Sequence, residues 1–124
     1  MINKEVIHIT YEYDASADAM FIEVENYEHE ESVSLNNNLI MDFNKNHEFI
    51  ALEILNASDV LDTNKHSLKK IINIDLRVKV TKDQIFISSI LTLPVQNKHV
   101  FKETNESIIN DMNIPVMDTN LVTA

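Results

Sequence analysis

The chain of 124 residues contains no cysteine, no glycine and no tryptophan. Without cysteine, disulfides, zinc–thiolate centres and cysteine nucleophiles are excluded. Without glycine, a glycine-rich phosphate-binding loop is excluded as well. No segment approaches the ~20 consecutive apolar residues that a membrane-spanning helix needs. We therefore expect a soluble protein that does not enter a membrane, and the lack of cysteine is compatible with the reducing cytoplasm.

The absence of glycine also constrains the turns. A backbone position that requires a positive φ angle must then be occupied by asparagine, aspartate or histidine, the residues that tolerate it best. Asparagine is plentiful and clusters at residues 36–38 and 44–46, with His47 directly after the second cluster. We interpret both clusters as turns.

Charge is distributed unevenly along the chain, whose net charge is −10. Residues 1–60 hold thirteen acidic residues against two lysines, a net charge of −11, and residues 61–124 carry +1. The phosphate backbone of a nucleic acid would repel such an acidic half. A basic protein or a cation would suit it better, although a surplus of acidic residues can also serve solubility alone.

Four segments of the first half show the two-residue alternation of half-buried strands: residues 6–13, 19–25, 39–43 and 48–55. Short polar turns separate them, which predicts a four-stranded antiparallel meander. Met20 and Ile22 would face the core. Phe21, Phe49 and Phe86 lie off the core register, so either a helix of the same chain or a second subunit should cover them.

The second half of the chain mixes helical and strand patterns. Residues 59–72 carry apolar residues at helical spacing after a capping Ser-Asp pair, and residues 103–112 predict a shorter helix. Between these helices, residues 74–80 and 84–93 predict a hairpin whose second strand ends at Pro94. The last eight residues should be extended, pairing with a sheet edge or fraying.

These elements together predict the α+β fold class. It would be mainly antiparallel β, with a four-stranded N-terminal meander, a later hairpin, a middle helix and a short C-terminal helix. The length of the chain, 124 residues, suits one domain over residues 1–124.

Two motifs carry a family resemblance. Residues 13–22 read Tyr-Asp-Ala-Ser-Ala-Asp-Ala-Met-Phe-Ile, and residues 52–58 read Leu-Glu-Ile-Leu-Asn-Ala-Ser, with Asp42 before the turn between them. Over roughly residues 6–60 the chain resembles a family of small prokaryotic proteins known as domain of unknown function twenty-two eighty-three. The motif residues in this chain are Tyr13, Asp14, Asp18, Glu53 and Ser58.

The resemblance implies no established activity. Genes of this family often stand beside those of small toxin-like ribonucleases, which implies an antitoxin role. The family commonly has glycine where His47 and Ala51 stand here. Residues 61–124 look like an extension found in archaeal relatives, comprising the predicted helix, hairpin and short helix.

Glu23, Asp42 and Glu53 would project from the outer face of one sheet, with His8 or Glu12 beside them. Carboxylate oxygens and an imidazole could bind a divalent cation. Alternatively, this face is solvated, or its charges are paired with basic residues of the later hairpin. The candidate metal ligands are therefore Glu23, Asp42 and Glu53.

No pattern in the sequence is typical of an enzyme, and we assign no catalytic or cofactor-binding residue. Asp14 and Asp18 stand in a turn before a strand, which favours backbone capping. The five histidines lack metal-ligand spacing. We expect a non-enzymatic protein-interaction or regulatory module, antitoxin-like, that binds a basic protein and self-associates. The alternative is a small enzyme or divalent-cation-binding protein that uses the acidic sheet face.

Overall fold

The computed structural model describes residues 6–24, 28 and 31–123, and these residues form nine strands in one sheet. The strands are β1 (Val6–Asp14), β2 (Ala19–Val24), β3 (Glu31–Ser34), β4 (Leu39–Phe43), β5 (Phe49–Leu55), β6 (Asn73–Val80), β7 (Gln84–Val95), β8 (Lys98–Ile109) and β9 (Met117–Thr123). Two four-residue helices, α1 (Ala57–Val60) and α2 (Lys65–Leu68), lie between β5 and β6. The fold is therefore mainly β, which corrects the predicted α+β class.

The strands follow the order β3-β4-β5-β2-β1-β9-β6-β7-β8 across the sheet. The predicted β1–β2 and β6–β7 hairpins are confirmed. The predicted meander is wrong, because β2 pairs with β5 and not with β4. The β5 strand is apolar at every position except Glu53, so an interior place in the sheet buries it better than an edge. The C-terminal strand β9 is extended as expected, but it lies mid-sheet, parallel to β1 and antiparallel to β6.

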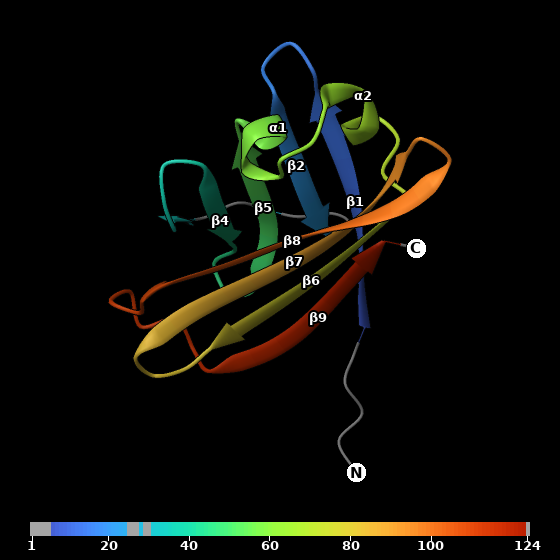
Figure 1. Cartoon of the computed structure of the whole chain (residues 1–124). Coiled ribbons are helices and arrows are strands. Elements are labelled where there is room, and N and C mark those ends of the chain that lie inside the picture. Colours follow the sequence, from blue (N-terminus) through green and yellow to red (C-terminus); the bar gives the residue numbers. More distant parts are fainter. Residues whose placement is uncertain (1–5, 25–27, 29–30, 124) are drawn as a thin grey trace.

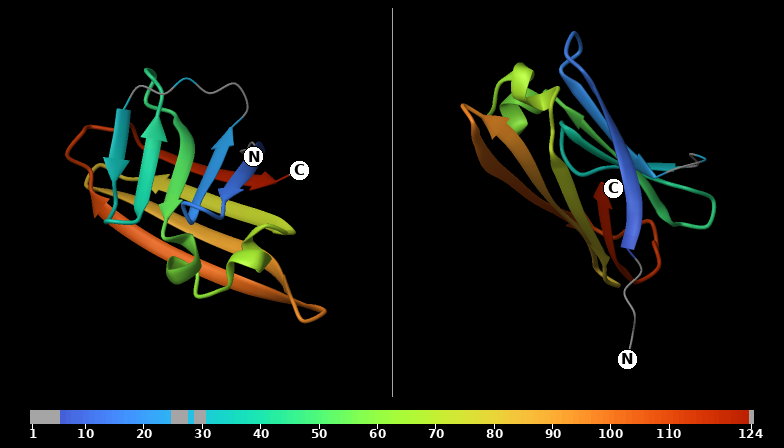
Figure 2. Two further views of the ribbon diagram at one scale, coloured as in Figure 1. Left: turned by 90° about the horizontal axis from the view of Figure 1, so that it is seen from above. Right: turned by 90° about the vertical axis from the view of Figure 1, so that its right-hand side faces the viewer.

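The sheet bends so that its two halves face each other. Figure 2 shows the strands of β1–β5 crossing those of β6–β9 in two layers, and Figure 1 shows both helices at one end of the molecule. The inner faces of both layers contribute to one hydrophobic core. Its largest fully buried side chains are Phe43, Met20, Ile22, Leu39, Met41, Leu52, Ile54, Leu68, Ile74, Ile85, Leu91 and Leu93. Apolar side chains of both layers therefore hold the described strands together.

The single helix predicted over residues 59–72 is wrong. Asp62, after α1, has a φ angle of 48°, which no right-handed helix accommodates. Asn64 is extended and caps α2, because its side chain accepts a hydrogen bond of 2.8 Å from the N–H of Ser67. The two helical turns bury Ala57 and Leu68 against the core.

The helix predicted over residues 103–112 is also wrong, since residues 98–109 form β8 and pair with β7 along twelve positions. Tertiary pairing outweighs a weak helical preference here. Pro94 does not end β7. The β6 strand begins at Asn73, opposite Thr92, so no strand lies where an N–H of residue 94 would donate.

A β-bulge moves Phe49 into the core. The register between β4 and β5 shifts at Asp42 and Phe43, leaving Ile50 as the additional residue of β5. The ring of Phe49 therefore packs edge-to-face on that of Phe43, with centroids 6.1 Å apart. The interpretation of Phe49 as an outward residue needing cover is thus wrong.

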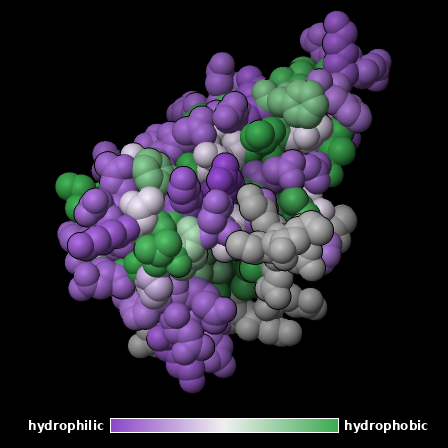
Figure 3. All heavy atoms as spheres, turned by 90° about the horizontal axis from the view of Figure 1, so that it is seen from below, coloured by the Kyte–Doolittle hydropathy of each residue, from purple (hydrophilic) through white to green (hydrophobic). Residues whose placement is uncertain are grey.

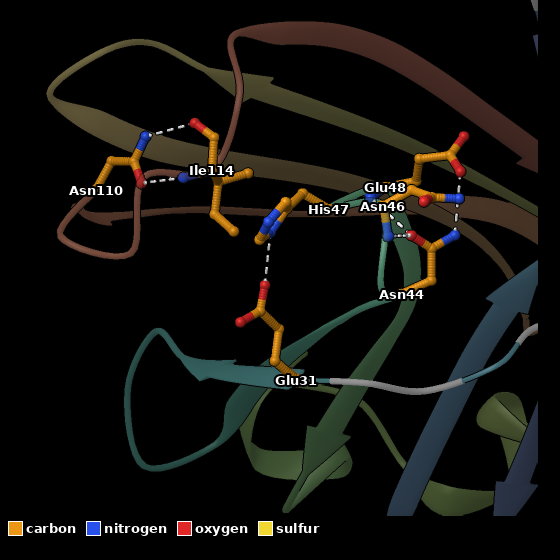
Figure 4. A network of polar contacts seen from close by, with 7 residues as sticks. All are labelled: Glu31, Asn44, Asn46, His47, Glu48, Asn110 and Ile114. Carbon is orange, nitrogen blue, oxygen red and sulfur yellow. Dashed lines mark hydrogen bonds and ion pairs between the residues drawn. The ribbon is translucent and has the colours of Figure 1, made fainter.

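As the lack of glycine predicts, asparagine, aspartate or histidine occupies six of the seven positive-φ positions among the described residues: Asp18, His47, Asn56, Asp62, Asn97 and Asn113. The seventh is Gln96. At the β4–β5 turn, His47 has a φ of 61°, and its Nδ1 lies 2.8 Å from a carboxylate oxygen of Glu31 on β3. Figure 4 shows this pair beside the loop after β8, where Asn110 bonds both the N–H and the carbonyl oxygen of Ile114. Side-chain bonds thus hold turns that glycine would otherwise occupy.

Candidate functional site

Three motif residues meet where the β1–β2 turn lies beside α1, at the upper end of the molecule in Figure 1. The Tyr13 hydroxyl donates a hydrogen bond of 2.7 Å to Oδ1 of Asp18. The Ser58 hydroxyl donates to Oδ2 of Asp18 at 2.7 Å, and the Ser58 N–H donates to Oδ1 at 3.1 Å. The N–H of Ala57 also donates to the backbone carbonyl of Asp18. Asp18 therefore fastens the first hairpin to α1.

These contacts set the protonation of the cluster. Burial acts to raise the pKa of Asp18, but hydrogen bonds from Ser58 and Tyr13, together with the charge of Lys65, hold this pKa below its usual value. Burial, followed by the contact with Asp18, raises the pKa of Tyr13. At neutral pH the cluster pairs a carboxylate with a neutral phenol. A carboxylate that already accepts three hydrogen bonds is suited to holding two segments together.

Asp14 closes the same turn from its other end. Its Oδ1 accepts hydrogen bonds from the hydroxyl of Ser16 at 2.6 Å and from the N–H groups of Ser16 and Ala17. These bonds, led by that of the Ser16 hydroxyl, lower the pKa of Asp14. The fifth motif residue, Glu53, lies elsewhere, on the outer face of β5.

The three candidate metal ligands lie on the outer face of the N-terminal half of the sheet. In the register, Ala51 of β5 lies between Glu23 of β2 and Asp42 of β4, while Glu53 occupies the next row. Asp42 is buried and accepts a hydrogen bond of 2.6 Å from the hydroxyl of Ser32. Among the residues that the structure describes, no three His, Asp or Glu side chains are grouped so that they could hold a metal ion.

The same outer face carries an exposed aromatic ring. Phe21 on β2 is 37% exposed and lies in register between Glu12 of β1 and Glu53 of β5, with Ile40 of β4 beyond Glu53. The helices pack on the core side of the sheet, so intramolecular helical cover of Phe21, one of the two expected alternatives, is wrong. The row Glu12–Phe21–Glu53–Ile40 is called the acidic row below.

The basic residues of the later hairpin lie on the other half of the sheet. Arg77 of β6 forms a two-bond ion pair with Asp118 of β9, at 2.9 and 3.1 Å. This contact raises the pKa of Arg77 through the hydrogen bond and the charge of Asp118. Arg77 is therefore engaged within its own layer, away from Glu23 and Asp42.

Comparisons with known proteins identify the family of this chain. The model of a family described as "Protein of unknown function (DUF2283)" matches residues 10–58. The uncharacterized protein MJ0789 of Methanocaldococcus jannaschii is 30% identical over 106 residues, which cover 85% of this chain and 88% of the relative. The chain belongs to this family of proteins of unknown function. No solved structure matches it.

A second relative of this chain comes from Methanosarcina mazei and is provisionally named a hypoxanthine phosphoribosyltransferase. It is 26% identical over 115 residues, which cover 93% of each chain. Both alignments are more than twice as long as the family segment, so each includes most of the chain after residue 58. The family segment itself contains all five motif residues and ends where Ser58 meets Asp18.

Reading the sequence missed the long strand β8. It occupies one end of the sheet and pairs with β7 alone among the described strands. Phe101 and Ile109 on its outer face are 69% and 70% exposed. The β-branched and aromatic residues between positions 100 and 109 could have indicated a strand, but polar residues on both faces hid the alternation.

Neither of the two helices in the described part of the chain has the length and apolar character of a membrane-spanning segment.

Proposed function

We propose that this protein is a non-enzymatic protein-interaction module that binds a basic partner through the acidic row. The observation that supports this proposal best is Phe21, an aromatic ring exposed on an interior strand of the sheet and flanked in register by two glutamates. Buried aromatic anchors surrounded by polar residues supply most of the energy of protein interfaces. The outer face of β1, β2, β5 and β4 offers such an anchor.

Charge supports the choice of partner. Residues 1–60 carry a net charge of −11, and Glu12 and Glu53 lie directly beside the ring. An acidic face steers a basic surface toward it and rejects acidic ones. Arginine or lysine side chains could contact the carboxylates while their aliphatic parts cover Phe21. Seen from below, the coloured residues show several apolar spots among mostly hydrophilic side chains (Figure 3).

The motif cluster supports a structural role beside this face. Asp18 engages Tyr13 and Ser58 and thereby fixes the β1–β2 hairpin, on which Glu12 and Phe21 lie. A fixed hairpin presents the acidic row without an ordering cost on binding. An antitoxin-like or regulatory role is the more specific form of the proposal, in which the basic partner is an enzyme that this binding inhibits.

Affinity capture from an extract of the source cells tests the proposal. Tagged wild-type protein should retain a basic partner at low salt and release it as the ionic strength rises. Phe21→Ser should lose that partner. Phe86→Ser is the matched control, because Phe86 is 36% exposed on the outer face of the other layer. Equal capture by both variants would refute the acidic row as the binding surface, and mass spectrometry of the captured protein decides the antitoxin-like form.

A further inference from the structure

Among the residues that the structure describes, no strand pairs with β8 on the side away from β7, so this edge exposes the backbone groups of alternate residues. The N–H of Asn110 donates to the carbonyl of Asp83 at 2.8 Å, which continues the β7–β8 register. In an antiparallel pair, hydrogen-bonded positions alternate along each strand. Even-numbered residues of β8 therefore bond to β7, and the odd-numbered residues from 99 to 109 direct their N–H and C=O groups away from β7, toward the free edge. A strand added there must bond to these odd-numbered residues.

The even-numbered side chains of β8 are self-complementary about Thr104. They are half-buried on the core side of the sheet and read Val100, Lys102, Thr104, Glu106 and Ile108. If a second β8 pairs antiparallel about a twofold axis at Thr104, valine faces isoleucine and lysine faces glutamate. Thr104 then faces its own copy. Apolar, opposite-charge and threonine pairs are the cross-strand combinations that stabilise sheets.

The odd-numbered side chains agree with the same register. It places in opposition the pairs Glu103–Asn105, Phe101–Ser107 and His99–Ile109. Asn105 already donates a hydrogen bond to Glu103 within one chain at 3.2 Å, so amide and carboxylate are chemically matched across the axis. These odd-numbered pairs would be the hydrogen-bonded ones, as the free edge requires.

Neighbouring registers do not have this complementarity. An axis at Lys102 or at Glu106 would place like charges opposite each other, and an axis at Glu103 would oppose two glutamates directly. An axis at Asn105 would set Lys102 against Ile108. Centring on Thr104 is the choice among these that pairs every charge of the core-side face with an opposite one. Inward-pointing charges normally protect a sheet edge from association, but here their symmetric placement favours one partner.

We propose that β8 pairs with β8 of a second copy, antiparallel and centred on Thr104, so that two sheets join into one continuous sheet. The proposal gives the self-association expected from the sequence a specific surface and register, and it does not depend on the acidic row. The interface is isologous and uses each β8 edge once, so it closes as a dimer and does not propagate. The β3 edge, four residues long, offers a much shorter surface.

Charge reversal tests the register. Lys102→Glu and Glu106→Lys should each weaken the dimer about tenfold or more, because two symmetric pairs change from attraction to repulsion. Mixing the two variants should restore a dimer, now a heterodimer, since every acidic position again faces a basic one. Sedimentation equilibrium and native mass spectrometry measure both results. Restoration on mixing also shows that each variant is folded.

Crosslinking tests the axis directly, because the chain has no cysteine of its own. Thr104→Cys should form a disulfide-linked dimer on oxidation, since facing non-hydrogen-bonded residues of antiparallel strands lie within disulfide range. Ser107→Cys, on the same strand but opposite Phe101, should not. A monomeric wild-type protein, dimers unaffected by charge reversal, or crosslinking by the position-107 variant alone would overturn the proposal. Phe21→Ser should dimerise normally, which separates this test from that of the acidic row.

Discussion

Asp18→Asn removes the charge from the motif cluster and leaves its shape almost unchanged. The carboxylate accepts three side-chain or backbone hydrogen bonds from Tyr13 and Ser58, all between 2.7 and 3.1 Å. A bond to a charged group contributes about 1.5–3 kcal/mol, toward the lower end where the group is partly exposed. Asparagine keeps one acceptor oxygen and tolerates the positive φ of 51°. We expect the free energy of unfolding to fall by about 2 kcal/mol, half or less of what three full bonds would give.

The assay is thermal or urea unfolding of both proteins at several pH values. At neutral pH, a loss of about 2 kcal/mol should lower the melting temperature by roughly 8 °C for a chain of this size. Asp62→Asn is the matched control: Asp62 also has a positive φ, is exposed, and has no hydrogen-bonded side chain in the described part of the chain. Its melting temperature should match that of the wild type.

The pH dependence of the stability difference tests whether the loss in Asp18→Asn comes from the missing charge. Because folding lowers the pKa of Asp18 below the ordinary aspartate value of 3.8, the stability that its carboxylate contributes is fully present above that value. This contribution is lost as the pH falls through the lowered, folded-state pKa. The stability difference between wild type and Asp18→Asn should therefore be constant near neutrality and narrow in acid. Equal stability of the two proteins at pH 7, or a difference unchanged at low pH, would refute the reasoning.

Two further predictions concern the core and the carboxylates. Phe49→Ala should cost about 3–5 kcal/mol in unfolding experiments, because the bulge buries this ring against Phe43, whereas Phe86→Ala should cost less than about 1 kcal/mol; similar losses would contradict the bulge. Calcium, magnesium or manganese should leave the melting temperature unchanged, although a bound cation at 100 times its Kd would add about 2.7 kcal/mol. A rise that Asp42→Asn abolishes would instead establish the cation site.

The sequence predicted the local elements of the N-terminal half well. Alternation of apolar and polar residues located β1, β2, β4 and β5 and assigned Met20 and Ile22 to the core and Phe21 to the outside. This success has a local cause, since each strand's two faces are encoded in consecutive residues. The lack of glycine likewise pointed to the residues that hold positive φ angles. The sequence did not predict the bulge at Phe49, because the bulge is a register shift between two strands and not a pattern within one of them.

Strand order could not be predicted in the same way. Nothing in residues 117–123 indicates that they insert between β1 and β6, because that position depends on two partners far apart in the chain. The candidate site also depends on the pairing of strands that are far apart in the chain. Tyr13, Asp18 and Ser58 could be identified as motif residues, but their contact requires β2 to pair with β5, with Ala19 opposite Leu55. The sequence therefore identified the residues of the motif, but their contact with one another became evident only from the strand pairing.

The difficulty with β8 arises from the feature that makes it distinctive. A strand that is covered on one face shows its burial as alternation, whereas Lys102, Thr104 and Glu106 occupy core-side positions of an edge strand that remain half-exposed. Their polarity removed the strand signal and left a helical interpretation. On an edge strand, however, these three side chains would contact any strand that pairs there. Lys102 and Glu106 lie at equal distances on either side of Thr104 and carry opposite charges. In the proposed dimer, the order that hid the strand in the sequence would match each lysine with a glutamate of the second copy.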